Sequence, residues 1–222
     1  EKRINYNKLS YYLISFYGGL SSITELAVSY HFKDVLKIQP SELSRLTSLI
    51  VLPWSLKPFL GLLTDFCPIF GYKRKFYIIL CGLLSMYCWF TMATMEPSLF
   101  ATFLCLFFIN IAGSFGSVLG EAIVVELARD KGSMELERRD ALNNNQNNND
   151  VNERLNTNED YNNRAKDYVS IFMIFKYSGV LFASFMKGSL VESIGIRGVF
   201  TIGIFLPILV LLAGLVMIDK KV

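Results

Sequence analysis

Charged side chains inside apolar stretches are the residues best placed to do chemistry. Two are lysines, Lys57 and Lys176, and two are acids, Glu25 and Glu121. A charged side chain at the centre of a membrane helix costs roughly 2.5–3.5 kcal/mol on insertion scales, so it is expected to face protein rather than lipid. These residue types predict a site where an ammonium group binds an organic anion and a carboxylate carries a proton.

Each of these assignments has a structural alternative that the sequence leaves open. Lys57 either contacts an anionic substrate or forms an ion pair with Glu25 or Glu121. Burial disfavours a charged carboxylate and so favours proton uptake, whereas a neighbouring lysine opposes it. If Lys57 does pair with an acid, substrate binding would break the pair and free the acid for a proton. Lys187 is expected to extend to the membrane interface instead.

The stretch 46–75 must position Lys57. Its apolar run is interrupted by two prolines and closed by a basic cluster. A single helix is predicted to align on one face, at spacings of three, four and four residues, Trp54, Lys57, Gly61 and Asp65. Trp54 is a candidate for stacking on an aromatic substrate ring, with helix packing as the alternative. The cluster beyond the helix predicts a cytoplasmic end and comprises Gly71, Lys73, Arg74 and Lys75.

The composition excludes several classes of protein. Of the 222 residues, 52% are hydrophobic and 18% are charged, which leaves too little polar surface for an ordinary soluble domain. The net charge of +3 is too small to predict nucleic-acid binding. The four cysteines lack metal or pairing spacing, and a single histidine, His31, excludes a two-histidine metal site. Because no catalytic motif is present either, we expect no metal, no cofactor and no enzyme activity.

Hydrophobic runs predict an all-α membrane protein. About 20 residues rising ~1.5 Å each cross a ~30 Å hydrocarbon core. Six transmembrane helices are predicted, four of them within 11–127 and two within 168–218, at 11–32, 46–66, 76–95, 99–127, 168–191 and 198–218. Asparagine makes up about half of residues 143–163, so 128–167 is expected to be a disordered loop because it cannot bury enough apolar surface.

The distribution of basic residues predicts the orientation. If both termini are cytoplasmic, the segments 1–10 and 219–222 and the loop 128–167 lie inside together with the basic cluster. The outer links then hold few basic residues, namely Lys33, Lys37, Arg45 and Arg197. This asymmetry favours a multi-pass protein with both termini in the cytoplasm, and it leaves open whether the membrane is the plasma membrane or an organellar one.

Four motifs resemble those of known transporters. Gly61-Leu-Leu-Thr-Asp65 followed by Gly71-Tyr-Lys73-Arg74-Lys75 resembles the signature between helices two and three of the major facilitator superfamily. Three further stretches, 32–40, 53–58 and 122–129, together look like the folate–biopterin transporter family. These motifs, in this order and at this spacing, extend over most of the chain.

This resemblance implies one half of a twelve-helix transporter. The chain would be the amino-terminal six-helix bundle of a proton-coupled symporter that moves folates, pterins or similar organic anions across a lipid bilayer by alternating access. Because such transporters bind substrate between two six-helix halves, the chain would supply only half of the site. Its second half would be a carboxy-terminal part, another subunit or a second copy. The chain departs from the family at Glu121, where an aspartate is more common, and in its Asn-rich insert.

The resemblance also implies roles for residues at the cytoplasmic side. The motif would form a gating latch that controls switching between inward-open and outward-open states. The implied latch residues are Gly61, Asp65, Gly71, Lys73, Arg74 and Lys75, with Glu126 and Arg129 at the end of the fourth span. Asp65 would pair with Arg129 or with a base in the second half. Glu126 and Arg129, three residues apart, could instead pair with each other.

A membrane-embedded assembly subunit derived from a half transporter is the alternative function. Six further apolar spans beyond Val222 in the parent gene would favour the transporter. An intramembrane enzyme or a channel is less favoured, because the sequence has neither a catalytic motif nor a ring of charges that would form a filter.

Overall fold

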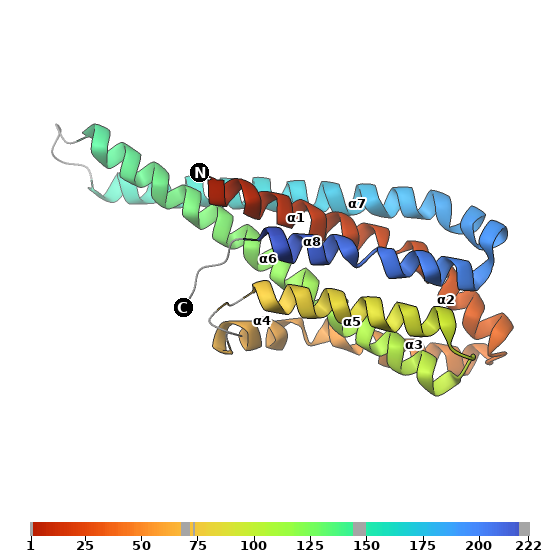
Figure 1. Cartoon of the computed structure of the whole chain (residues 1–222). Helices are drawn as coiled ribbons and strands as arrows, with labels where there is room; N and C mark the ends of the chain where they lie inside the picture. The colour runs from red at the N-terminus through yellow and green to blue at the C-terminus, as the bar shows by residue number, and fades with distance from the viewer. Residues whose placement is uncertain (1, 68–71, 73, 144–149, 218–222) are drawn as a thin grey trace.

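The computed structural model of the chain describes residues 2–67, 72, 74–143 and 150–217, with side-chain environments for 8–64, 66–67, 72, 74–125, 166–167 and 169–217. The described chain is almost entirely helical, and its helices lie roughly along one axis (Figure 1). The elements are α1 (Lys2–Leu20), α2 (Ile23–Tyr30), the π-helical turn η1 (His31–Val35), α3 (Pro40–Ser55), α4 (Lys57–Phe66), α5 (Lys75–Thr94), α6 (Leu99–Asn143), α7 (Asp150–Phe205) and α8 (Ile208–Val216).

Proline chemistry interrupts the helix that the sequence predicts around Lys57. The structure ends α3 at Ser55 and begins α4 at Lys57, with Leu56 between them at φ −88° and ψ 4°. Pro58 has no N–H group to donate to the carbonyl four residues earlier, and the Leu56 N–H bonds to the Pro53 carbonyl at 3.1 Å. The prediction of one continuous helix is therefore wrong, and Lys57 occupies the first turn of a new helix. Trp54, Lys57 and Gly61 nevertheless all face α6.

Gly195 reverses the direction of the chain within α7. Its φ of 71° and ψ of 175° are not helical, and only glycine adopts this conformation without steric cost. Residues 196–205 and α8 then run back along the bundle, as Figure 1 shows at the blue end of α7. We call this end of the bundle the opposite end, and we call the end that holds the start of α1 and the end of α8 the terminal end.

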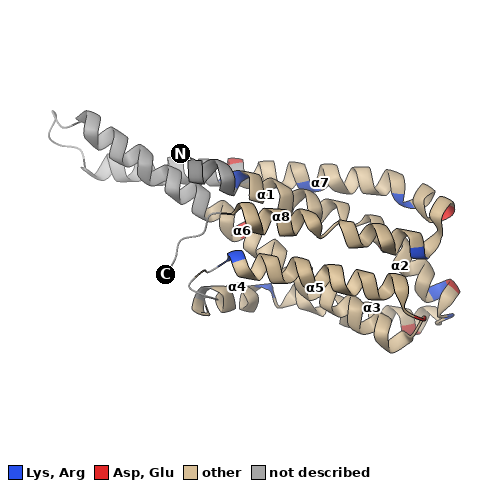
Figure 2. Cartoon of the chain, in the orientation of Figure 1, with Lys and Arg blue, Asp and Glu red and all other residues tan. Residues whose placement is uncertain are grey.

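Four stretches of the described chain are long and apolar enough to cross a membrane, namely Pro40–Thr64, Lys75–Thr94, Leu99–Val125 and Val169–Val216. The last stretch contains the reversal at Gly195. The predicted first span, 11–32, is absent from this set, since α1 and α2 are separate helices joined at Ser21 and Ser22. Charged residues gather toward the ends of the bundle (Figure 2).

The helices α6 and α7 extend further than the sequence predicts. The structure continues α6 to Asn143 and begins α7 at Asp150, whereas the sequence predicts a disordered loop over 128–167. A helix satisfies its backbone hydrogen bonds internally, so it can continue beyond the apolar part of the bundle. The stretch 128–143 also contains several strong helix formers, including Ala, Leu, Glu, Arg and Lys.

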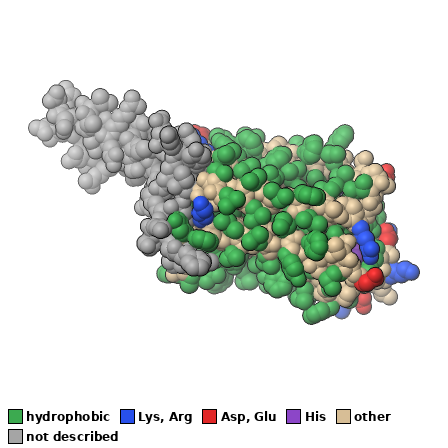
Figure 3. Space-filling model, viewed as in Figure 1, with side chains coloured by type: hydrophobic (Ala, Val, Ile, Leu, Met, Phe, Trp, Pro, Cys, Tyr) green, Lys and Arg blue, Asp and Glu red, His purple; other side chains and the backbone are tan. Residues whose placement is uncertain are grey.

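The bundle interior contains two clusters of buried apolar side chains. One cluster joins α1, α5, α6, α7 and α8 and includes Tyr11, Ile78 and Leu119. The other lies toward the opposite end and includes Trp89 and Phe200. Large apolar side chains also cover the outer surface, as the green areas of Figure 3 show. A monomeric soluble protein rarely exposes so extensive an apolar surface, whereas a lipid environment matches it.

Candidate functional site

A cavity of 850 Å³ opens between α1, α2, α3, α5, α6 and α7. Its size lies within the roughly 300–1,000 Å³ range of small-molecule pockets. The wall is mostly apolar, with hydroxyl and amide groups from several helices among the lining residues. The charged lining residues in the described part of the chain are Glu25, Lys176 and Lys187. The cavity therefore combines an apolar wall with an excess of one positive charge.

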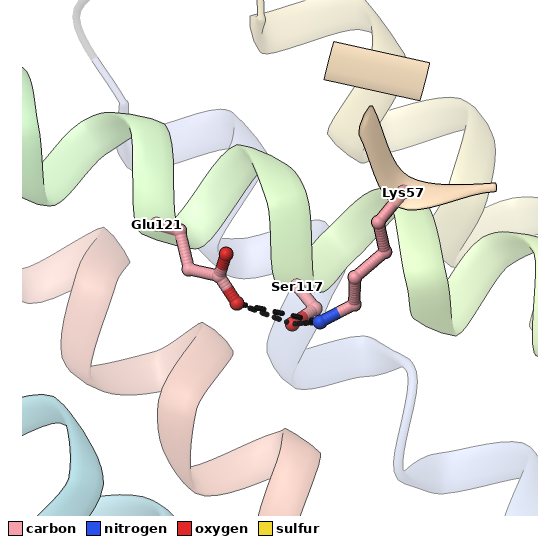
Figure 4. Close-up of polar contacts among 3 residues, drawn as sticks. All are labelled: Lys57, Ser117 and Glu121. Carbon is pink, nitrogen blue, oxygen red and sulfur yellow. Dashed lines mark hydrogen bonds and ion pairs between the residues drawn. The ribbon is translucent and has the colours of Figure 1, made fainter. Parts of the chain in front are cut away.

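Lys57 and Glu121 form an ion pair at the edge of this cavity (Figure 4). The Lys57 Nζ donates to Ser117 Oγ at 2.8 Å and to Glu121 Oε1 at 3.4 Å. Ser117 Oγ donates to the same Glu121 oxygen at 3.0 Å. Because Ser117 and Glu121 are one turn apart on α6, their side chains reach the lysine at the start of α4 together. Of the two acids that the sequence leaves open, Glu121 is the partner of Lys57.

Trp54 on α3 is held against the cavity by groups on α4 and α6. Its indole N–H donates to Asn110 Oδ1 at 2.9 Å, and the Lys57 Nζ lies 4.7 Å from the ring centroid. Gly113 faces the ring, where a Cβ would lie 3.6 Å from Cζ2. Both Trp54 and Asn110 line the cavity. The sequence reasoning missed Asn110, although an amide within an apolar span was a signal that could have identified it.

Three charged residues line the cavity without a charged partner. Glu25, Lys176 and Lys187 make no side-chain hydrogen bond or ion pair to any residue that the structure describes. The sequence predicts that Lys187 extends to the membrane interface, and in the structure Lys187 is one of the residues that line the cavity. Lys176 and Glu25 also line the cavity.

The described part of the basic cluster lies at the start of α5 and contacts α6 and α8. Arg74 donates to the Ala122 carbonyl at 3.3 Å, and Lys75 donates to the Leu215 carbonyl at 3.3 Å. A Cβ at Gly61 would lie 3.4 Å from a Val118 methyl group, so α4 and α6 approach closely there. The other implied latch groups lie outside the described residues or side chains, namely Asp65, Gly71, Lys73, Glu126 and Arg129.

The apolar surface and the apolar spans define an all-α, multi-pass integral membrane protein. The sequence profile of the BT1 family matches residues 18–136, which is more than half of the chain. The chain therefore belongs to the BT1 family. This match includes the Lys57–Glu121 pair, Trp54 and Asn110.

Several curated relatives resemble the chain over part of their length. Folate transporter 1 of Plasmodium falciparum (isolate 3D7) is 31% identical over 219 residues, which cover 97% of this chain and 37% of the relative. The folate-biopterin transporter of Synechocystis sp. is 37% identical over 116 residues, covering 52% of this chain and 24% of the relative. The probable folate-biopterin transporter 2 of Arabidopsis thaliana is 29% identical over 217 residues, covering 95% and 37% respectively.

The chain thus matches only part of each relative, namely 37%, 24% and 37% of their respective lengths. No solved structure matches the chain.

Proposed function

We propose that the chain is the amino-terminal half of a secondary transporter that moves folate-type or pterin-type organic anions across a membrane. The observation that carries this proposal is the 850 Å³ cavity, whose wall holds Lys176 and Lys187 without charged partners in the described part of the chain. An unpaired ammonium group in an apolar setting is costly, and an anionic ligand would offset this cost. The names of the curated relatives support the substrate class.

Four residues would contact the substrate. Trp54 offers an aromatic face to a pteridine ring, and Asn110 fixes the orientation of that face. Lys57 and Lys176 would bind oxygen acceptors of the ligand, and Glu121 would accept hydrogen bonds from its amino groups. This assignment combines the cavity wall with the polar contacts at its edge.

Proton coupling would use the two acids near the cavity. A ligand that takes over the ammonium group of Lys57 would leave Glu121 without its charged partner, which favours protonation of the carboxylate. Glu25, which lines the cavity without a charged partner in the described region, is the second candidate proton carrier. Transport would then couple the entry of the anion to the entry of a proton.

In this proposal the chain forms six transmembrane spans with both termini in the cytoplasm, and it transports by alternating access. In transporters built from repeats, two such bundles usually rock against each other about a central binding site. The second bundle would be a carboxy-terminal half, another subunit or a second copy. The basic cluster at the start of α5 would stabilise one of the two states, because Arg74 donates to α6 and Lys75 donates to α8.

Uptake of radiolabelled folate and biopterin by cells that produce the protein tests this proposal. We expect uptake that rises with an imposed proton gradient and falls when Lys57 is changed to Gln. The exposed Lys33, which does not line the cavity, gives a matched control, Lys33→Gln. A correctly folded protein that neither binds nor transports either compound would favour the non-transporting assembly subunit instead.

A further inference from the structure

The helix α7 presents two lysines to the cavity from one face. Lys176 and Lys187 are eleven residues apart, and both line the cavity. At 3.6 residues per turn, eleven residues return to within about 20° of the same direction, and a rise of ~1.5 Å per residue separates them by about 16 Å. The helix has no non-helical residue between them, since its break is at Gly195. Their Cα atoms therefore lie far apart along the length of the cavity.

Contacts between helices show which end of the cavity each lysine occupies. A Cβ at Gly120 on α6 would lie 3.3 Å from the Phe172 ring on α7. One turn away from this contact, Lys176 on α7 and Ser117 on α6 both line the cavity. Lys176 therefore lies in the same part of the cavity as Ser117, which contacts Lys57. Lys187 lies toward the opposite end of the bundle.

Glu25 lies toward the same end as Lys187. The Ser15 hydroxyl donates to the Phe172 carbonyl at 2.6 Å, and a Cβ at Gly19 would lie 2.9 Å from the Gly179 Cα. Because both residue numbers increase between these two contacts, α1 and α7 run in the same direction. Glu25 follows Gly19 by six residues, and Lys187 follows Gly179 by eight. The two residues therefore lie at a similar position along the bundle axis. The two side chains form no ion pair, so the Lys187 ammonium group remains available to a ligand.

We propose that Lys187 is a specificity-determining residue that binds the anionic tail of an elongated ligand whose ring lies beside Trp54 and Lys176. This inference rests on the proposed function and adds to it a requirement on ligand length. A flat heterocycle that carries a carboxylate at the end of a long substituent can contact both lysines at once. A heterocycle with a short neutral substituent contacts only the Lys176 end. The cavity would therefore bind a ligand with a carboxylate tail more tightly than a ligand without one, and Lys187 alone would account for the difference.

Binding of two probes to the purified protein tests this inference. Folic acid has a long carboxylate tail, and biopterin has a short neutral side chain. We expect Lys187→Gln to weaken folic acid binding about 10-fold, equivalent to about 1.4 kcal/mol, and to leave biopterin binding unchanged. Lys176→Gln should weaken both. Lys187→Arg keeps the positive charge and should retain most of the affinity for folic acid, and Lys33→Gln should affect neither probe.

Two results would overturn the inference in different ways. Suppose that the unchanged protein binds both probes and that Lys187→Gln weakens the binding of both equally or of neither. Lys187 then does not bind the anionic tail, although the proposed function stands. If the unchanged protein binds neither probe, the proposed function fails and the inference fails with it.

Discussion

The ion pair between Lys57 and Glu121 is expected to contribute little to the stability of the fold. The side chains of Lys57 and Glu121 are 27% and 54% exposed in the isolated chain. Exposed pairs contribute only about 0–1 kcal/mol, because solvent screens the charges and both side chains lose freedom. The pair is therefore easy to break, as an exchange of partners with a ligand would require.

Changing Lys57 to Gln should separate these two contributions. We expect uptake to fall about 10-fold or more, since a charge-assisted contact to the ligand is lost. The melting temperature of the purified protein should fall by no more than about 2–4 °C, which corresponds to about 1 kcal/mol for a chain of this size. Uptake assays and thermal unfolding measure the two effects. A large loss of stability with normal specific uptake would show that the pair is structural.

Asn110 controls the orientation of Trp54 through a single hydrogen bond of 2.9 Å. Changing Asn110 to Leu removes the acceptor, so the indole should become more mobile and its contact with a ligand ring weaker. Fluorescence can report this in a Trp89→Phe background, because the chain has two tryptophans. We expect lower anisotropy of Trp54 and weaker quenching by biopterin. Unchanged quenching in the Asn110→Leu variant would show that Asn110 does not contribute to the contact between Trp54 and the ligand.

At the scale of elements, the crossing of α1 and α7 determines the shape of the cavity. Gly19 and Gly179 bring the two backbones into contact, because a Cβ at Gly19 would clash with the Lys176 carbonyl and lie 2.8 Å from the Val180 nitrogen. The carbonyl belongs to a lysine in the cavity wall. Any separation of these two helices would therefore also displace Lys176.

Two adjacent glycines provide a matched test of this crossing. Gly19→Ala should destabilise the protein by about 1–3 kcal/mol or more, because the added methyl group meets backbone that cannot move aside cheaply. Gly18→Ala should leave the melting temperature unchanged or raise it, since nothing lies within 4 Å of a Cβ there. Thermal unfolding of the two variants compares them directly. Equal stability of both variants would mean that the helices tolerate a wider crossing.

At the scale of the whole molecule, the proposed orientation places the terminal end in the cytoplasm. Cys67 is exposed at the end of α4, and the other three cysteines are buried. Glu96 is exposed in the link between α5 and α6, at the opposite end. These two positions can therefore report the two sides of the membrane without interference from the buried thiols.

Labelling with a membrane-impermeant maleimide tests this orientation in sealed, right-side-out vesicles. We expect a Glu96→Cys change in a Cys67→Ser background to be labelled from outside. Cys67 in the unchanged protein should react only after the vesicles are opened, because the proposed span separates it from the reagent. Labelling of Cys67 before opening would reverse the orientation, and labelling of neither residue after opening would contradict their exposure.

Some features of the site could be predicted from the sequence, and others could not. The charge of Lys57 within an apolar run marked it as a site residue, and its pairing with an acid was one of two stated alternatives. Asn110 was missed because an amide carries no charge and its partner, Trp54, is 56 residues away. Lys187 was assigned to the interface because its position near the end of a predicted span says nothing about the direction in which its helix face points.

The amino-acid sequence alone was enough to predict the helical membrane class, the charged residues inside it and the resemblance to a transporter family. Hydrophobic length and residue type are properties of local stretches, so they can be read along the chain. Only the tertiary structure decided that Glu121 is the partner of Lys57 and that Lys176 and Lys187 share one cavity. Such pairings depend on the rotation and register of whole helices, and these are set by distant contacts such as the crossing at Gly19 and Gly179.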